Sequence, residues 1–286
     1  MLNFNRISSI PNSLSVRGEL MKKEHYPFQW IRRERVKIGL SFLVSLVTIL
    51  FSTSLSARPL STDDVGITEK GNFVLETGFD AIRLDNHDMV YKPVLTLTYG
   101  LLERMEVAAT GGYLFFRPNE GENKNGFADT ELKLKYRLTD ETPWVPSFGV
   151  KGTLKTPTAS ESKELGSGKM DFNIKGIATK NLSKRLAVSL NLGYTFIGEH
   201  HVDNDLTYSL GAVFAMSEKW ALVGEVGGSN KLNGRREDRP FSSLIGTYYL
   251  LSKNIIWDAG VEIGMNKAAP DYRVTTGFTF LFKPPF

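Results

Sequence analysis

The sequence predicts an all-β fold, a transmembrane antiparallel up-and-down β-barrel of about 12 strands, on three observations. Beyond residue 70, the chain reads as segments of roughly ten residues in which polar and apolar side chains alternate. Aromatic residues lie near the segment ends, and the connections between segments are short and long in turn. All three features are typical of barrels in the outer membrane of Gram-negative bacteria.

Residues 1–57 are predicted to be a signal peptide that is removed on export. Ile38 to Ala57 is an uncharged stretch rich in Leu, Val, Ile and Phe. A basic segment (32–37) precedes it, and small residues (52–57) end it. That order of basic, apolar and small residues defines a secretory signal. The alternative is an N-terminal anchor that stays attached to the protein.

The excess of basic over acidic residues in the chain lies in this leader. The whole chain has 35 basic and 31 acidic residues, and the leader holds eight Lys and Arg with three acids. The remaining 27 basic and 28 acidic residues are nearly balanced and give no ground for nucleic-acid binding. The chain has no cysteine, which excludes disulfides, thiol catalysis and thiolate metal sites.

The exported part is predicted to be one barrel domain with short flanking segments. Residues 58–70 contain Pro59 and Asp63 and are either a periplasmic lead-in or a short plug folded into the lumen. The barrel covers 71–282, and 283–286 form a C-terminal tail. The predicted strands are 71–85, 89–102, 105–117, 127–138, 144–156, 170–180, 186–198, 206–216, 219–229, 241–251, 254–265 and 272–282.

The alternation assigns each side chain to a face. In the fourth segment, Lys133 and Lys135 share one face, and Leu132 and Leu134 share the other. A lysine that faces lipid near the bilayer midplane costs roughly 2–4 kcal/mol, so the lysines are predicted to point inward. A soluble β-sandwich would alternate as well, but it would bury its aromatic residues in mid-strand. The aromatic residues near segment ends are Tyr91, Tyr99, Trp144, Tyr194, Phe196, Tyr208, Trp220, Tyr248 and Trp257.

The connections predict the orientation of the barrel. Short connections follow the even-numbered segments, and long polar ones follow most of the odd-numbered segments; the first, 86–88, is short and breaks the pattern once. Outer-membrane barrels have short periplasmic turns and longer external loops. Both termini are therefore expected in the periplasm. The long polar connections include 118–126, 157–169 and 230–240.

The same alternation predicts two groups of charged side chains inside the lumen. The basic group is Lys133, Lys135, Arg137, Lys151, Lys155 and Lys175. The acidic group is Glu76, Asp80, Glu106, Glu225, Asp258 and Glu262. If the two groups face each other as walls of an open pore, they set up a transverse field that selects charged or dipolar solutes. The alternative is that they pair across a narrow lumen and close it.

No set of residues predicts catalysis, a cofactor or a metal ion. His87, His200 and His201 fall in connections predicted to lie outside the cell, so no strand offers a histidine to a catalytic triad. His200, His201 and nearby acids could bind a metal ion, but a solvated polar loop is the simpler reading because nothing fixes their spacing. The expected partners are outer-membrane lipid, lipopolysaccharide and an unknown small solute.

Two short motifs resemble known sequences. The last segment contains Thr275, Gly277, Phe280 and Phe282 and looks like the outer-membrane assembly signal, which implies that the assembly machinery is a partner. Residues 58–76 resemble the start of the meta-pathway phenol-degradation outer-membrane β-barrel family. This resemblance implies a transporter-like barrel that passes aromatic or other small molecules, and it supplies no catalytic residues.

The sequence therefore favours an outer-membrane channel, porin-like, for passive passage of small solutes, aromatic ones among them. The alternative is a closed structural or surface-interaction barrel that acts through its external loops.

Overall fold

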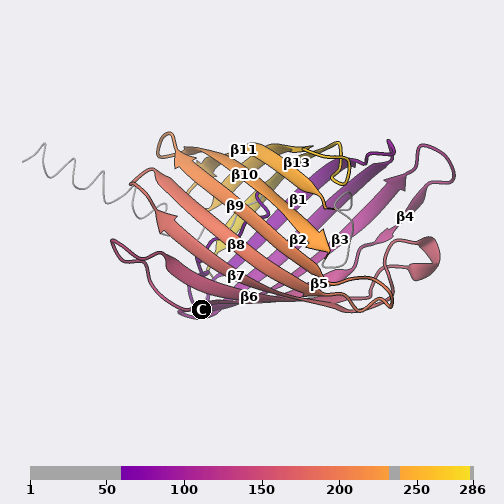
Figure 1. Ribbon diagram of the computed structural model, residues 1–286. Helices are drawn as coiled ribbons and strands as arrows, with labels where there is room; N and C mark the ends of the chain where they lie inside the picture. Colours follow the sequence, from indigo (N-terminus) through magenta and orange to yellow (C-terminus); the bar gives the residue numbers. More distant parts are fainter. Residues whose placement is uncertain (1–58, 232–238, 284–286) are drawn as a thin grey trace, which may run out of the picture. The chain divides into compact units, whose positions relative to one another are not determined.

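The computed structural model describes residues 59–231 and 239–283, which form a closed antiparallel β-barrel (Figure 1). Twelve strands make up the barrel, and one short extra strand extends its wall. The predicted fold class is confirmed. The predicted signal peptide and most of the predicted C-terminal tail lie outside the described residues. Within the described part of the chain, no helix has the length and apolar character needed to cross a membrane.

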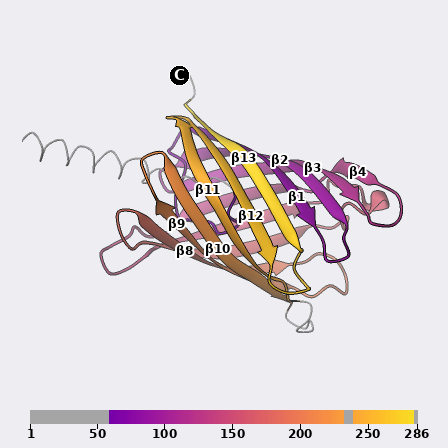
Figure 2. The ribbon, with the colours of Figure 1, turned by 90° about the horizontal axis from the view of Figure 1, so that it is seen from above.

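Each barrel strand pairs with its neighbours in the chain, and the last strand closes the ring on the first. The strands are β1 (Phe73–Arg83), β2 (Met89–Leu102), β3 (Met105–Arg117), β4 (Lys124–Phe127), β5 (Thr130–Arg137), β6 (Ser147–Thr156), β7 (Asp171–Asn181), β8 (Leu186–Phe196), β9 (Asp205–Ala215), β10 (Trp220–Lys231), β11 (Phe241–Ser252), β12 (Ile255–Gly264) and β13 (Tyr272–Phe282). A short 3-10 turn, η1 (Glu161–Lys163), lies in the connection after β6. Figure 2 shows β13 between β12 and β1, where Phe73 is paired with Phe282 and Arg83 with Tyr272.

The two-residue period of the strands separates an apolar outer face from a polar inner face. On β5, Leu132 and Leu134 are exposed on the outside, whereas Lys135 is 3% exposed inside. The outer face carries large apolar side chains on every side of the ring, of which Ile245 is 68% exposed. An apolar surface this extensive is unfavourable in water and is the surface that a lipid bilayer covers.

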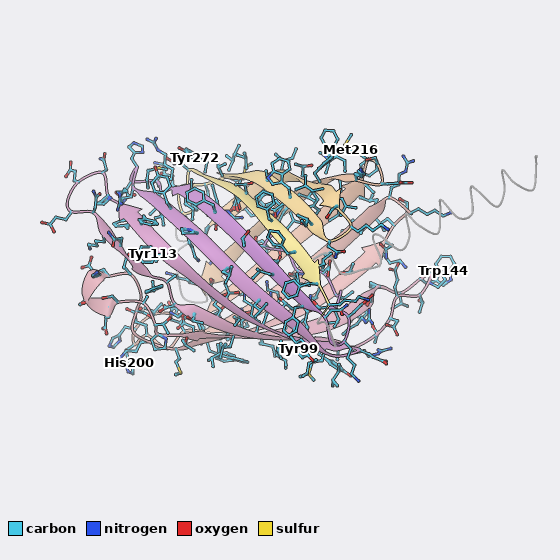
Figure 3. The ribbon with its side chains drawn as sticks, turned by 180° about the vertical axis from the view of Figure 1, so that it is seen from behind. Tyr99, Tyr113, Trp144, His200, Met216 and Tyr272 are labelled. Carbon is cyan, nitrogen blue, oxygen red and sulfur yellow. The ribbon has the colours of Figure 1, made fainter. Side chains whose placement is uncertain are left out.

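The two ends of the barrel differ, and they are called here the short-turn end and the long-loop end. The short-turn end carries the connections 103–104, 138–146, 182–185, 216–219 and 253–254. Figure 3 shows Trp144 at the short-turn end, and Tyr113 and His200 toward the opposite one. Trp144 lies in a turn instead of the predicted strand and is 93% exposed.

Aromatic side chains lie on the outer face near both ends, with one correction. Tyr248 was expected among them, but it is paired with Asp258 and Ala221, which are both buried inside the barrel. Its neighbour Tyr249 is the residue on the outer face, opposite Trp257. Because two tyrosines are adjacent here, the sequence alone does not show which of them faces outward.

Strand β4 forms where the sequence predicts a loop. It pairs with the outer part of β3, from Tyr113 opposite Phe127 to Phe116 opposite Lys124. The rings of Tyr113 and Phe127 meet edge to face at 5.4 Å, and the Tyr113 hydroxyl donates to Asn125 at 3.0 Å. These contacts stabilise a β-hairpin that extends the wall at the long-loop end.

Candidate functional site

Residues 59–68, called here the inner segment, lie inside the barrel. Pro59 rests against the paired glycines Gly246 and Gly260, where an added Cβ would come within 2.9 Å of the proline ring. Val65 and Ile67 are buried, although they belong to no strand. The small inward-facing residues of the wall therefore leave room for a stretch of chain that crosses the lumen.

The inner segment is bound to the acidic side of the lumen by hydrogen bonds to Glu225 on β10. The backbone N–H of Thr62 donates to Glu225 Oε2 at 2.6 Å, and the Ser61 hydroxyl donates to Glu225 Oε1. The Thr62 hydroxyl also donates to Ser209 Oγ on β9 at 2.8 Å. Among these contacts, neutral donors satisfy a carboxylate that would otherwise be costly to bury.

On the basic side, Asp63 is bound by charge. Its carboxylate lies 2.5 Å from Lys151 Nζ on β6 and 2.8 Å from Lys175 Nζ on β7. Burial raises the pKa of the Asp63 carboxyl, but the nearby Lys151 and Lys175 lower it by more, so this pKa lies well below its usual range. The carboxylate is therefore ionised at neutral pH and forms two ion pairs.

The backbone of Asp63 is fixed as closely as its side chain. Its N–H donates to Asn191 Oδ1 at 2.7 Å, and Asn191 Nδ2 donates back to the Asp63 carbonyl at 2.8 Å. Asn191 lies on β8 and is 2% exposed. This reciprocal pair sets the position from which the carboxylate reaches the two lysines.

The remainder of the inner segment runs along the wall to the start of β1. The N–H of Val65 donates to Thr179 Oγ1 at 3.2 Å, and the N–H of Thr68 donates to Glu106 Oε2 at 2.6 Å. Glu106 also pairs with Lys135 at 2.9 Å. Contacts with strands from β3 to β12 thus anchor the inner segment across the lumen.

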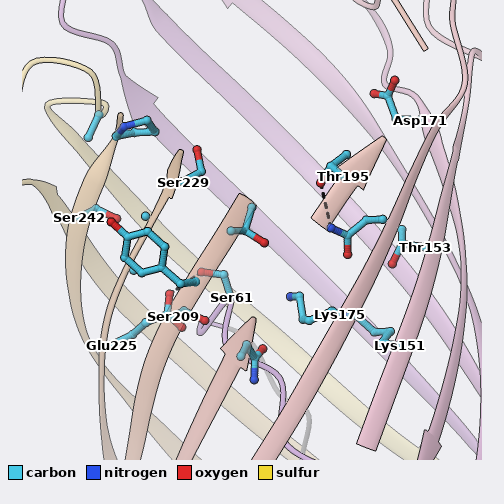
Figure 4. A pocket seen from close by; sticks show the side chains of 18 of the residues that line it. Ser61, Lys151, Thr153, Asp171, Lys175, Thr195, Ser209, Glu225, Ser229 and Ser242 are labelled. Atoms are coloured by element: carbon cyan, nitrogen blue, oxygen red, sulfur yellow. Dashed lines mark hydrogen bonds between the residues drawn. The ribbon is translucent and has the colours of Figure 1, made fainter. Parts of the chain in front are cut away.

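A polar cavity of about 670 Å³ lies in the lumen, with Ser61 of the inner segment among its lining residues. Its wall includes Pro240 and Pro270 from the connections at the long-loop end, so the cavity opens toward that end. Figure 4 shows Lys151 and Lys175 on one side of the cavity and Glu225 with Ser242 on the other. Its charged lining residues are Glu131, Lys133, Lys151, Lys155, Asp171, Lys175, Glu225 and Glu262.

The structure brings only part of the two predicted charge groups to this cavity. Four basic residues of the prediction line it, Lys133, Lys151, Lys155 and Lys175, together with two acidic ones, Glu225 and Glu262. The others lie elsewhere: Arg137 pairs with Asp140 near the short-turn end, Lys135 pairs with Glu106, and Glu76, Asp80 and Asp258 lie on β1 and β12.

The charged side chains of the lumen also do not form two unpaired groups that face each other across an open pore. Glu106 was expected opposite the lysines, but β3 is the neighbour of β5 in the ring, so Glu106 lies beside Lys135. Glu262 pairs with Arg273 on the adjacent strand at 2.7 Å. Several charges are therefore balanced by close neighbours, and the inner segment bridges the two sides of the lumen.

The most important residues that the sequence did not single out for the site are Ser61, Thr62 and Asn191. In the sequence, Asp63 stands out only as part of the segment that precedes the barrel. The sequence did contain one indication of the inner segment. Gly246 and Gly260 are paired on neighbouring strands and face inward, and glycines in such positions allow another stretch of backbone to approach the wall.

The four residues of the predicted assembly signal lie on β13. Thr275 and Gly277 face the lumen, and Phe280 and Phe282 face outward. The ring of Phe282 stacks on that of Phe73 at 5.8 Å, at the point where the ring of strands closes. Across residues 59–231 and 239–283, no three His, Asp or Glu side chains are grouped so that they could hold a metal ion.

A closed barrel with an apolar outer face and a polar lumen defines the class of outer-membrane β-barrels, and comparisons agree. The chain belongs to the family described as "Putative MetA-pathway of phenol degradation", whose model matches residues 97–282. No curated protein matches the chain in sequence.

Solved structures share the fold at low sequence identity. An outer-membrane channel from Pseudomonas putida F1 is 14% identical, with a TM-score of 0.61 over 78% of this chain and 100% of its own. The NanC porin is 10% identical, with a TM-score of 0.54 over 73% and 98%. The KdgM porin in complex with oligogalacturonate is 12% identical, with a TM-score of 0.51 over 72% and 99%.

Proposed function

We propose that the protein is an outer-membrane channel for passive passage of small polar solutes, including aromatic ones, and that it is not an enzyme. The observation that carries this proposal is the polar cavity of about 670 Å³ inside a barrel whose outer face is apolar. Pockets of roughly 300–1,000 Å³ suit small organic molecules. Family membership supports solutes related to aromatic degradation.

In this proposal, the short-turn end faces the periplasm and the long-loop end faces outside. The contrast in connection length between the two ends supports this orientation. Both chain termini are then periplasmic. Outer-membrane lipid and lipopolysaccharide surround the apolar belt.

The inner segment determines whether the channel is open. We expect low conductance from the whole protein in a planar bilayer, because the inner segment crosses the lumen. Deletion of residues 59–68 should raise single-channel conductance at least several-fold while the barrel still assembles. Heat-modifiable migration on a gel would check assembly of both proteins.

A closed structural barrel is the second candidate, favoured by the buried ion pairs of Asp63 with Lys151 and Lys175. It makes the opposite prediction. A folded deletion variant that stays silent over a wide range of voltages would rule out the channel and leave the structural role.

Assembly machinery is proposed as a partner through β13. The variant Phe282→Asp places a charge where Phe282 stacks on Phe73 and should strongly reduce the amount of protein in outer-membrane fractions. Phe286→Asp is the matched control and should have less effect. The reverse order of effects would mean that the signal is read at the chain end instead.

A further inference from the structure

The two lysines that hold Asp63 are placed where a solute would meet them. Lys151 and Lys175 both line the cavity that opens toward the long-loop end. A molecule that enters from this end meets their ammonium groups in the same cavity as the inner segment, whose Ser61 also lines it. The bound partner of these lysines is a carboxylate that belongs to the chain itself.

The contacts of Asp63 are those of a bound small carboxylate. Both of its oxygens lie 2.5 Å from Lys151 Nζ, and Oδ2 also lies 2.8 Å from Lys175 Nζ. Charge-assisted contacts of this length are among the strongest that a protein offers to an anion. The carboxylate of Asp63 therefore occupies the position that a solute carboxylate would take on the two lysines.

The site cannot remain empty at low cost. If the inner segment moved away alone, two largely buried ammonium groups would be left side by side without their carboxylate. Water would reach these ammonium groups once the inner segment had left, but their mutual repulsion would remain, and a bound anion relieves it. Replacement of Asp63 by another anion avoids this cost, so release of the inner segment is coupled to anion binding.

We propose that Lys151 and Lys175 form a binding site for small carboxylates, and that a solute carboxylate displaces Asp63 and thereby releases the inner segment. This inference rests on the proposed channel function and adds its solute class and its trigger. Asp64 is the natural comparison residue within the same segment, because its carboxylate accepts a local hydrogen bond from the Gly66 N–H.

The test uses benzoate as the probe on the whole protein in planar bilayers. Benzamide, its neutral isostere, and chloride at equal ionic strength are the controls. Because a short tether gives Asp63 an effective concentration on the order of millimolar or more, benzoate at about 10 mM or above should be needed. Conductance should then rise several-fold with benzoate and remain unchanged with benzamide and chloride.

Two variants identify the residues involved. Asp63→Asn should open the channel without benzoate to a conductance above that of the benzoate-bound unaltered protein, and benzoate should then lower it to that level by occupying the lysines. Adding Lys175→Gln to Asp63→Asn should remove this reduction. Asp64→Asn removes the same charge one residue away, near Lys135 and not at Lys151 or Lys175, and should still need benzoate to open.

A second readout follows the inner segment itself. The single variant Val65→Cys should react faster with a water-soluble maleimide when benzoate is present, because Val65 is buried in the closed state. Equal effects of benzoate and chloride would overturn the assignment to carboxylates. Equal behaviour of Asp63→Asn and Asp64→Asn would overturn the role of Asp63.

The outcomes also separate this inference from the proposed function. If the variant that lacks residues 59–68 conducts but benzoate has no effect on the whole protein, the carboxylate site is wrong and the channel stands. If the deletion variant and Asp63→Asn are both silent, the channel function itself fails.

Discussion

The basic and acidic sides of the lumen hold the same inner segment by different interactions. On β6 and β7, Lys151 and Lys175 bind Asp63 through ion pairs. On β10, Glu225 accepts hydrogen bonds from the Ser61 hydroxyl and the Thr62 N–H, which are neutral. The two lysines thus recognise one charged side chain, whereas Glu225 recognises one hydroxyl and one backbone N–H.

This difference has a consequence for gating. A solute anion can replace the Asp63 carboxylate on the lysines, because any carboxylate offers the same two oxygens. No small solute replaces a backbone N–H that approaches Glu225 as part of a continuous chain. The basic side is therefore the one at which a solute acts, and the acidic side returns the inner segment to its closed position.

The largest expected effect comes from locking the inner segment to the wall. The Cβ of Val65 lies 3.8 Å from the position that a Cβ at Gly149 would take, which matches the mean Cβ separation of about 3.8 Å in disulfides. The double variant Val65→Cys with Gly149→Cys should form a disulfide, and the chain has no other cysteine to compete.

With this disulfide formed, benzoate should produce no increase in conductance, and a reducing agent should restore the response. Each single cysteine variant serves as the control and should be indifferent to the reductant. Full conductance through the oxidised protein would show that solutes pass without movement of the inner segment, and the contrast between the two sides would then have no role in gating.

The outer wall was predictable from the sequence because its pattern is local. Strand period alone placed Lys133 and Lys135 inside and Leu132 and Leu134 outside, since a lysine in lipid is costly and neighbouring residues must face opposite ways. The sequence could not decide between Tyr248 and Tyr249, because two adjacent aromatic residues fit either parity.

The path and contacts of the inner segment were not predictable in the same way, although a short plug in the lumen was one of the two alternatives for residues 58–70. The inner segment has no period, and its contacts join residues far apart in the chain, such as Thr62 and Glu225 at a separation of 163 residues. Strand β4 was missed for a related reason, because it depends on the tertiary contact of Phe127 with Tyr113. Such elements depend on partners that the local sequence does not identify.

A smaller effect is expected from the acidic side. Glu225→Gln keeps one oxygen that can accept from Thr62 N–H but loses the charge that strengthens both hydrogen bonds. Hydrogen bonds to charged groups contribute roughly 1.5–3 kcal/mol, and only part of this is lost. Conductance without benzoate should therefore rise by less than it does in Asp63→Asn.

The comparison of these two variants tests the asymmetry directly. In Glu225→Gln, benzoate should still raise the conductance, because both lysines and Asp63 remain. In Asp63→Asn, it should only lower the conductance, to that of the benzoate-bound unaltered protein. A Glu225→Gln variant that opens as widely as Asp63→Asn and ignores benzoate would show that the two sides hold the inner segment equally.

The smallest expected effect is that of acid below about pH 4. Lys151 and Lys175, with Lys135 nearby, lower the pKa of Asp63 well below its usual range, despite the opposing effect of burial. In the released state this carboxyl should return to its ordinary pKa of about 3.9. A group whose pKa is depressed in the closed state favours closure above its ordinary pKa, and this contribution is lost as the pH falls toward the depressed value.

The window for acid opening therefore begins only below about pH 4, under the ordinary pKa of an aspartate. Single-channel conductance of the whole protein should be constant from pH 7 to about 4.5 and should start to rise below that range, whereas Asp63→Asn should stay open throughout. If opening begins near pH 6 instead, an ordinary histidine would have the matching pKa of about 6.5, and the closed state would not depend on the Asp63 ion pairs.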